Sequence, residues 1–294
     1  MFKSLLSLKH RVLLLMCFVL LSSCSMRQLI VRNIDYFLMR EMDSYFDLTS
    51  EQYDIYRKKG GVHLEWFKQT QIPWIKTEVE IIRMAKEPLP PEFLRSVAEE
   101  KFKKAWIAVC DRMAADAAVL FHSLTPAQLE HFEERLIEKS KLFSKLVELP
   151  PDDYLEEYRD IQDDGLDRMS DWVGSVTDEQ KAMFLKLTFV GQEQYRQEAA
   201  IWIEIRTAFI SQLKQKIKQG GVEDFLKKWA RHPDIDGQKY AQYRKWRLSR
   251  QIDVWVAMEK TITPKQRSYR SEQMLQVISD LNTMLETNYS PSEK

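Results

Sequence analysis

Apolar residues along this chain recur three or four positions apart and hardly ever alternate with polar ones, which favours helices and argues against strands. Glycine, which weakens helices, occurs 8 times in 294 residues. The sequence therefore predicts an all-α fold, either a multi-helix antiparallel bundle or an elongated helical array. One long stripe illustrates the pattern: Trp202, Ile205, Phe209, Leu213 and Ile217.

Two expectations about the helices are specific enough to be tested. Residues 178–219 contain this stripe and are predicted to form one helix of about 60 Å at 1.5 Å per residue. A second predicted helix, over residues 92–122, has Phe102, Trp106 and Met113 on its apolar side. Most of the 8 tryptophans lie on such apolar stripes and are expected in the core. Several tryptophans on one exposed concave face would instead mark a binding surface.

One helix-start pattern occurs four times, as an aliphatic residue, Thr, two variable residues and Gln. The Thr hydroxyl can accept a hydrogen bond from the backbone amide three residues on, and the Gln side chain can reach back to the Thr amide. Together these two bonds form a capping box. The simpler alternative is four good helix starts with no shared role. The predicted caps are Thr49, Gln52, Thr125, Gln128, Thr177, Gln180, Thr263 and Gln266.

The spacing of the four copies predicts two similar helical halves. The first two Thr residues lie 76 positions apart and the last two lie 86 apart. Proline-containing linkers at residues 88–91 and 232–233 fall at similar places in the two spans. We therefore expect a tandem duplication, with one half in residues 24–148 and the other in residues 149–294. Fused halves would make the mature domain a monomer.

The N-terminal segment has the three-part layout of a secretory signal. Residues 1–11 contain Lys3, Lys9 and Arg11 but no acid, and residues 12–21 are an unbroken apolar run. This run is about half as long as the roughly 20 residues that a membrane-spanning helix needs. Residues 1–23 are therefore predicted to be a signal peptide rather than a membrane anchor.

The sequence Leu21-Ser22-Ser23-Cys24 at the end of this segment resembles the bacterial lipobox. The resemblance implies cleavage before Cys24, attachment of diacylglycerol to its thiol and acylation of the new amine with a chain such as palmitate. Two or more acyl chains hold a protein firmly on a membrane. Because Ser25 stands where aspartate would resemble an inner-membrane retention signal, we expect anchoring in the outer membrane, facing the periplasm.

The charge of the mature chain argues against nucleic acid as a partner. Removal of residues 1–23 leaves 41 bases and 44 acids, a net charge of about −3, whereas nucleic-acid binders carry a basic face. Cys110 is then the remaining unmodified cysteine, so no intrachain disulfide can form. Its apolar neighbours predict a small buried hydrophobe rather than a reactive thiol.

No pattern in the sequence indicates catalysis, a cofactor or a metal. There is no phosphate-binding glycine loop, no nucleophile elbow and no zinc-site spacing. Acidic pairs such as Asp152-Asp153 and Asp163-Asp164 lack the spacing of a calcium loop, and solvated helix faces explain them. We therefore expect no catalytic residue, no metal ligand and no cofactor. The mature histidines are His63, His122, His131 and His232.

The four helix starts resemble the LTxxQ motif of Spy/CpxP-type periplasmic proteins, which include small helical chaperones and stress-response regulators with cradle-like surfaces. The likeness covers the four Thr–Gln pairs and the aliphatic residues before them. The chain departs from that family in its greater length, its lipobox and its many tryptophans. The lipobox, an aromatic helix and the segment 47–52 also resemble a family of proteobacterial lipoproteins of unknown function. This second resemblance implies an all-helical fold in the envelope.

These observations lead to an expected function. The chain is predicted to be a non-enzymatic, outer-membrane-anchored periplasmic lipoprotein that binds protein clients through a helical surface, in a Spy-like chaperone or stress role. The alternative is a structural or adaptor lipoprotein that serves one envelope-assembly partner. A cell-wall hydrolase is the least favoured interpretation, because no motif supports it. It stays open because carboxylate pairs for glycoside cleavage meet only in the fold.

Overall fold

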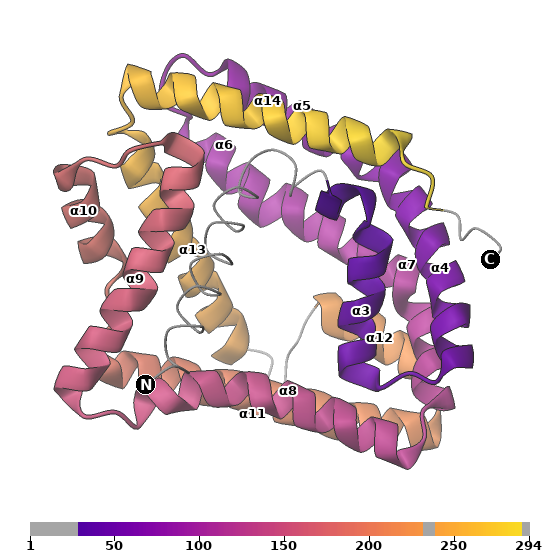
Figure 1. Cartoon of the computed structure of the whole chain (residues 1–294). Helices are drawn as coiled ribbons and strands as arrows, with labels where there is room; N and C mark the ends of the chain where they lie inside the picture. The colour runs from indigo at the N-terminus through magenta and orange to yellow at the C-terminus, as the bar shows by residue number, and fades with distance from the viewer. Residues whose placement is uncertain (1–28, 232–238, 290–294) are drawn as a thin grey trace, which may run out of the picture.

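The computed structural model describes residues 29–231 and 239–289, which form thirteen helical segments and no strand. The predicted all-α fold is confirmed, and the helices form an array (Figure 1). In chain order the elements are α3 (Ile34–Phe46), α4 (Ser50–Thr70), α5 (Ile72–Met84), α6 (Pro91–Arg95), the π-helix η1 (Ser96–Lys101), α7 (Phe102–Ser123), α8 (Pro126–Val147), α9 (Pro151–Val173), α10 (Asp178–Thr188), α11 (Gln192–Gln219), α12 (Val222–Arg231), α13 (Lys239–Glu259) and α14 (Pro264–Glu286).

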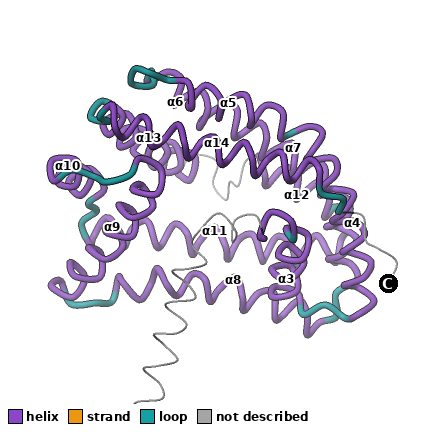
Figure 2. Tube along the Cα trace, turned by 45° about the horizontal axis from the view of Figure 1, so that its top comes forward, coloured by secondary structure: helices purple, strands orange, loops and turns teal. Residues whose placement is uncertain are grey.

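The helices are arranged as a four-sided frame in the view of Figure 1. α5 and α14 run antiparallel along one side, and α8 and α11 run antiparallel along the opposite side. α9, α10 and α13 form the third side, and α3, α4 and α12 form the fourth, which α7 reaches at its end after crossing from α6. Figure 2 shows the same two long pairs from another direction, separated by the remaining helices. Among the described helices, none is long and apolar enough to cross a membrane.

Residues 24–148 and 149–294 interleave instead of packing as separate units. α5 from the first segment packs on α14 from the second, and α11 from the second packs on α8 from the first. In the same way α12 packs on α7, and α13 packs on α6. If α5 corresponds to α11, α8 to α14, α6 to α12 and α7 to α13, the contact of α5 with α14 corresponds to that of α11 with α8. The contact of α6 with α13 then corresponds to that of α12 with α7.

Apolar clusters at the junctions of the helices hold the frame together. Around the start of α8, Phe46 and Phe132 stack with their ring centroids 4.9 Å apart, and Phe121 meets Phe132 edge-on at 5.4 Å. Around the start of α14, a separate cluster contains Met169, Val173, Met258 and Ile262, and each of them is at most 5% exposed. The core is thus divided between junctions, as expected for an open arrangement of helix pairs.

The prediction of one helix over residues 178–219 is wrong, because the chain breaks between α10 and α11. The tyrosine hydroxyls of α9 donate to carbonyls that the break leaves free: Tyr158 to Thr188 at 2.9 Å and Tyr154 to Val190 at 2.7 Å. These long-range hydrogen bonds replace those of a continuous helix. Because they come from another element, local helix propensity does not reveal the break.

The expectation that most tryptophans lie in the core is also wrong. All 8 lie in the described residues and none of them is fully buried. Four of them are exposed by 37–50%, namely Trp106, Trp172, Trp246 and Trp255.

Candidate functional site: paired helix starts and a basic aromatic pocket

The structure places every predicted Thr–Gln pair at a helix start with both hydrogen bonds of a capping box. In all four, the Thr amide donates to the Gln Oε1 at 2.9–3.0 Å, and the Gln amide donates to the Thr Oγ1 at 3.2 Å. The boxes begin α4, α8, α10 and α14. Thr49, Thr177 and Thr263 have an extended backbone conformation, which is typical of the residue that caps a helix start.

The four boxes come together in two pairs through their glutamines. Gln128 Nε2 donates to Gln52 Oε1 at 2.7 Å and to the Asp47 carbonyl at 2.8 Å. Gln266 Nε2 donates to Gln180 Oε1 and to the Ser175 carbonyl, both at 2.8 Å. In both pairs the accepting carbonyl lies two residues before the partner's Thr. The pairs lie at opposite corners of the frame in Figure 1, at the starts of α4 and α8 and at the starts of α10 and α14.

This pairing explains why all four motifs end in Gln, although Glu also completes a capping box. Each side-chain amide accepts through Oε1 from its own Thr and its partner, and donates through Nε2 to its partner and a carbonyl. Gln128, Gln180 and Gln266 are at most 6% exposed, so every polar atom needs such a partner. The role of these residues is therefore to join helix ends within the fold.

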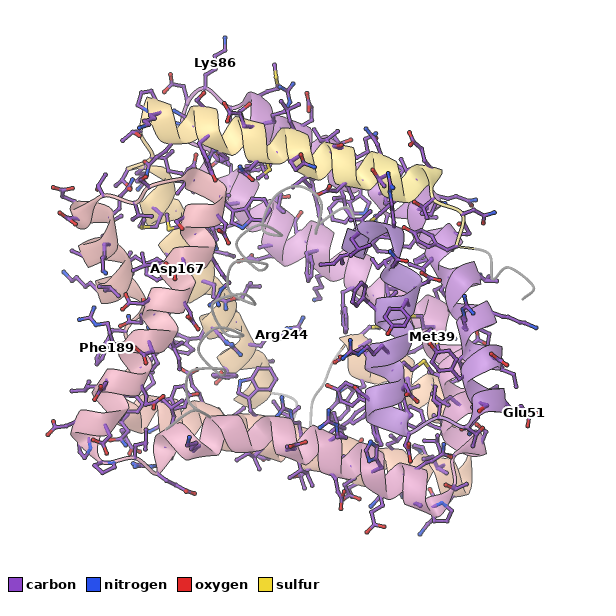
Figure 3. The ribbon with its side chains drawn as sticks, in the orientation of Figure 1. Met39, Glu51, Lys86, Asp167, Phe189 and Arg244 are labelled. Atoms are coloured by element: carbon purple, nitrogen blue, oxygen red, sulfur yellow. The ribbon has the colours of Figure 1, made fainter. Side chains whose placement is uncertain are left out.

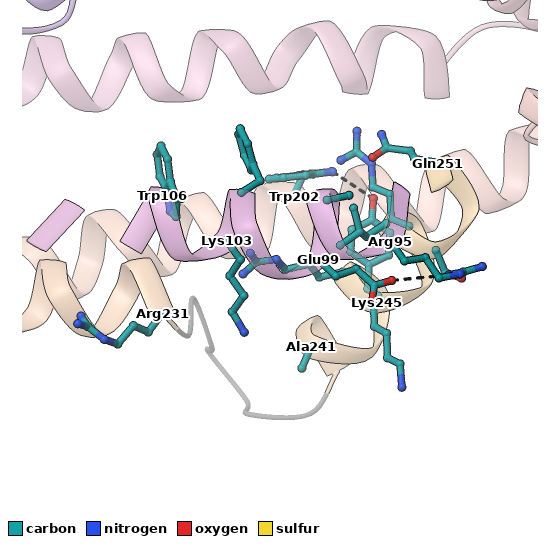
Figure 4. A pocket seen from close by; sticks show the side chains of 16 residues that line it. Arg95, Glu99, Lys103, Trp106, Trp202, Arg231, Ala241, Lys245 and Gln251 are labelled. Carbon is teal, nitrogen blue, oxygen red and sulfur yellow. Dashed lines mark hydrogen bonds and ion pairs between the residues drawn. The ribbon is translucent and has the colours of Figure 1, made fainter. Parts of the chain in front are cut away.

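A pocket of about 930 Å³ opens on a different part of the frame, between η1, the first half of α7 and the first half of α13 (Figure 4). Trp202 of α11 also lines it. Aromatic side chains and bases dominate the lining, with Glu99 as its one acid among the described residues. The bases are Arg95, Lys103, Arg231, Arg244, Lys245 and Arg247.

The first wall of the pocket is one face of the continuous helical segment α6–η1–α7. Its lining residues lie three or four positions apart, at positions 95, 98, 99, 102, 103 and 106. η1 is a π-helical segment, a feature that occurs frequently at functional sites. Phe102 is 65% exposed and Trp106 is 50% exposed. The predicted apolar side of this helix is thus left open at its start, whereas Leu120 and Phe121 near its end are buried.

The bases of the pocket differ in how firmly they are held. Arg95 pairs with Asp253 at 2.6 Å, and Arg231 forms two hydrogen bonds with the Asp111 carboxylate, which lower the pKa of Asp111. The remaining cations have no carboxylate partner within the described residues. Arg247 lies over the Trp202 ring at 5.2 Å, and the other three are Lys103, Arg244 and Lys245. Figure 3 shows Arg244 extending from α13 into the interior of the frame.

A polar chain lies behind the pocket. Trp202 Nε1 donates to the Tyr243 hydroxyl at 3.2 Å, and that hydroxyl donates to Glu198 Oε2 at 3.1 Å. Burial, followed by the charge of Glu198, raises the pKa of Tyr243 to about 12. The phenol therefore stays neutral at physiological pH and fixes the orientation of Trp202. Glu198 also lines an adjoining pocket of about 430 Å³, as do Trp202 and Arg247.

The histidines of the described chain lie away from this pocket. His63 Nε2 is 2.9 Å from Asp116 Oδ2, His131 Nε2 is 3.2 Å from the Ser44 carbonyl, and His122 is exposed. His232 lies outside the described residues. None of the described histidines lines a pocket given above, and no group of three or more His, Cys, Asp or Glu within the described residues could hold a metal ion.

Two cysteines, Cys24 and Cys110, follow the predicted signal peptide. Cys24, the predicted lipidation site, lies outside the described residues. Cys110 is partly buried on α7, and burial raises the pKa of its thiol to about 11, with a further contribution from Asp111. A thiol with such a pKa is almost entirely protonated at neutral pH, which makes it a poor nucleophile.

The pocket was not predicted from the sequence, although one signal points to it. Residues 239–250 contain five bases, three aromatic residues and no acid, an unusual density for a chain with 44 bases and 44 acids. The other walls come from residues 95–106, Trp202 and Arg231, which show no comparable clustering.

Comparison with known sequences places most of the described chain in one family. The sequence model described as "Family of unknown function (DUF6279)" matches residues 44–217. The match contains the first three capping boxes and the α7 wall of the pocket, and α13 lies beyond it. No curated protein and no solved structure matches the chain.

Proposed function

We propose that this chain, which belongs to the family of unknown function DUF6279, is a non-enzymatic outer-membrane lipoprotein that binds proteins through the basic aromatic pocket of its frame. Anchoring through Cys24 rests on the lipobox-like sequence at residues 21–24. Protein binding rests on one observation: Phe102 and Trp106 are exposed beside cations that lack carboxylate partners.

The composition of this surface supports a protein-binding role. Aromatic residues and arginine are enriched where protein interfaces gain most of their binding energy. Burial of apolar surface contributes roughly 25 cal/mol per Å² removed from water, and Phe102 and Trp106 still expose half or more of their surface. Because both side chains are already exposed, a complex in which a partner covers them would be stabilised by burial of their apolar surface.

The same pocket does not favour the hydrolase alternative. Glycoside cleavage commonly uses two carboxyl groups about 5–10 Å apart on either side of the scissile bond. The described lining contains Glu99 alone, and Arg95 lies near it at 3.6 Å. A pair of acids in one cleft, which the hydrolase would need, has no counterpart here.

Two forms of protein binding remain, and different observations favour them. The LTxxQ-like helix starts favour a Spy-like role with many clients, because that is where the resemblance lies. The adaptor with one dedicated partner is favoured by the fixed charges, since Arg95 and Arg231 are held by ion pairs and Arg247 by Trp202. Fixed positions suit one complementary surface.

The proposal includes an internal duplication that makes the mature domain a monomer. Its support is the repeated Gln–Gln pairing and the exchanged helix contacts of the two segments. The helices after the first and third boxes nevertheless differ in length, because α4 has 21 residues and α10 has 11. If the chain arose by duplication, the two copies have since diverged, so that the helix after the third box ends sooner than the helix after the first.

The test is crosslinking in cells with a photoreactive residue at position 106, followed by mass spectrometry. The matched control carries it at position 86, because Figure 3 shows Lys86 pointing away from the frame. We expect protein adducts at 106 and few at 86. One dominant adduct identifies an adaptor, and many adducts identify a chaperone. Equal yields at both positions, or none at either, would refute protein binding through the pocket.

A further inference from the structure

We infer that the pocket between η1, α7 and α13 takes an acidic peptide segment in which carboxylates alternate with aromatic or aliphatic side chains. This inference rests on the proposed function and names the chemistry of the bound ligand. It is supported by the positions of the charges, by the cations that have no carboxylate partner within the described residues, and by the exposed aromatic rings in the same pocket.

The lining of the pocket is strongly basic. Among the described lining residues there are six bases and one acid, although the whole chain has 44 of each, and only Arg95 and Arg231 of these bases are paired with a carboxylate outside the lining. Such a local excess creates a positive potential that attracts carboxylates and repels basic segments. Lys103 and Lys245 are exposed, so they approach a ligand without first giving up an ion pair.

The cations without carboxylate partners lie on two walls of the pocket. Lys103 belongs to α7, whereas Arg244 and Lys245 belong to the first turns of α13. Arg247 stacks on the Trp202 ring, and a guanidinium held in this way still presents its edge to a planar carboxylate. A segment lying between the walls can therefore meet bases on both sides.

The length of the pocket favours a peptide over a compact anion. The lining face of α6–η1–α7 extends from Arg95 to Trp106, which is about 16 Å at 1.5 Å per residue. Charges spread over that length suit carboxylates repeated along a chain better than a single headgroup. Phe102 and Trp106 project from the same face and provide contact area for apolar side chains between the carboxylates.

The test measures binding of fluorescent 12-residue peptides to the detergent-solubilised full-length protein. The probe alternates Glu with Phe and Leu, and two controls carry Gln or Lys in place of Glu. The pocket variant combines Lys103→Glu, Arg244→Glu and Lys245→Glu. A matched variant with the same charge change combines Lys86→Glu, Lys218→Glu and Lys265→Glu, all of them exposed lysines that do not line the pocket. Thermal unfolding by circular dichroism verifies that both variants fold.

We expect the Glu peptide to bind more tightly than either control and to weaken as salt is raised. The pocket variant should raise its Kd at least about tenfold, and the matched variant should leave it within about twofold. Equal binding of the Glu and Gln peptides, or no loss in the pocket variant, would overturn the inference.

Anionic lipid is the competing ligand, and mixed micelles distinguish it. If phosphatidylglycerol displaces the Glu peptide while phosphatidylcholine does not, and binds more tightly than the peptide, the pocket is a lipid site and the inference is wrong. Failure of the inference also differs from failure of the proposed function. If adducts at position 106 persist in the pocket variant, protein binding through the pocket is supported. Only the inference that the bound segment is acidic is then wrong.

Discussion

The side-chain amides of Gln180 and Gln266 hydrogen-bond each other in both directions, with Nε2 to Oε1 distances of 3.0 and 2.8 Å, although 86 residues separate them. Each of these Oε1 atoms also accepts from the Thr amide of its own helix start, at 3.0 Å for Gln180 and 2.9 Å for Gln266. Each glutamine therefore caps its own helix and also links the starts of two helices that are distant in sequence. Stability measurements can separate the two roles.

Substitution of Gln180 by Glu should destabilise the fold strongly. A carboxylate keeps the capping interaction but cannot donate to Gln266 Oε1 or to the Thr261 carbonyl, and it places a charge at a site that is 2% exposed. We expect a loss of about 3 kcal/mol in the free energy of unfolding, measured by urea titration. The control Gln215→Glu, on an exposed part of α11, should stay within about 0.5 kcal/mol. Similar values for the two variants would contradict the role assigned to this link.

Removal of a cap hydroxyl should cost less. Thr125→Ala deletes the acceptor of the 3.2 Å bond from the Gln128 amide and should lower the free energy of unfolding by about 1 kcal/mol. Thr49→Ala and Thr177→Ala should behave alike, because their bonds have the same length. If all three denaturation midpoints stay unchanged, the hydroxyls do not stabilise these helix starts.

Loss of the predicted lipidation site should release the protein from the membrane. Cys24→Ala removes the thiol that would receive diacylglycerol, so the chain should remain uncut or become soluble in the periplasm. Fractionation and intact mass of the product provide the measurement. A variant that still carries acyl chains and sediments with the outer membrane would refute the anchoring.

Alkaline pH should destabilise the fold through its buried tyrosines. Burial raises the pKa of Tyr158 and Tyr243 from 10.0 to about 12, so the folded state favours their neutral forms. Their contribution to stability is complete below about pH 10 and is lost as pH rises through about 12. Urea midpoints between pH 8 and 12 should fall over that interval. Tyr158→Phe should lower stability below about pH 10, because it removes the bond to Thr188, and should reduce the alkaline loss. An unchanged pH profile in this variant would exclude Tyr158 as a contributor.

The helices and their starts could be predicted from the sequence because the interactions behind them are local. The Thr–Gln boxes involve atoms three residues apart, and the apolar spacing of each helix repeats within two turns. Even the break at Pro73 and the end at Gly220 follow from single residues. For these elements the tertiary structure adds little.

The pairing of the boxes, the break before α11 and the pocket depend on contacts between distant residues. Gln52 and Gln128 are 76 residues apart, and Tyr154 acts on a carbonyl 36 residues away. The apolar face that holds Phe102 and Trp106 has the same spacing whether a neighbouring helix covers it or not. Periodicity reports that a face is apolar, but its exposure depends on where the other helices pack. That arrangement is a property of the whole chain, because burial is decided by all the surfaces that compete to be removed from water.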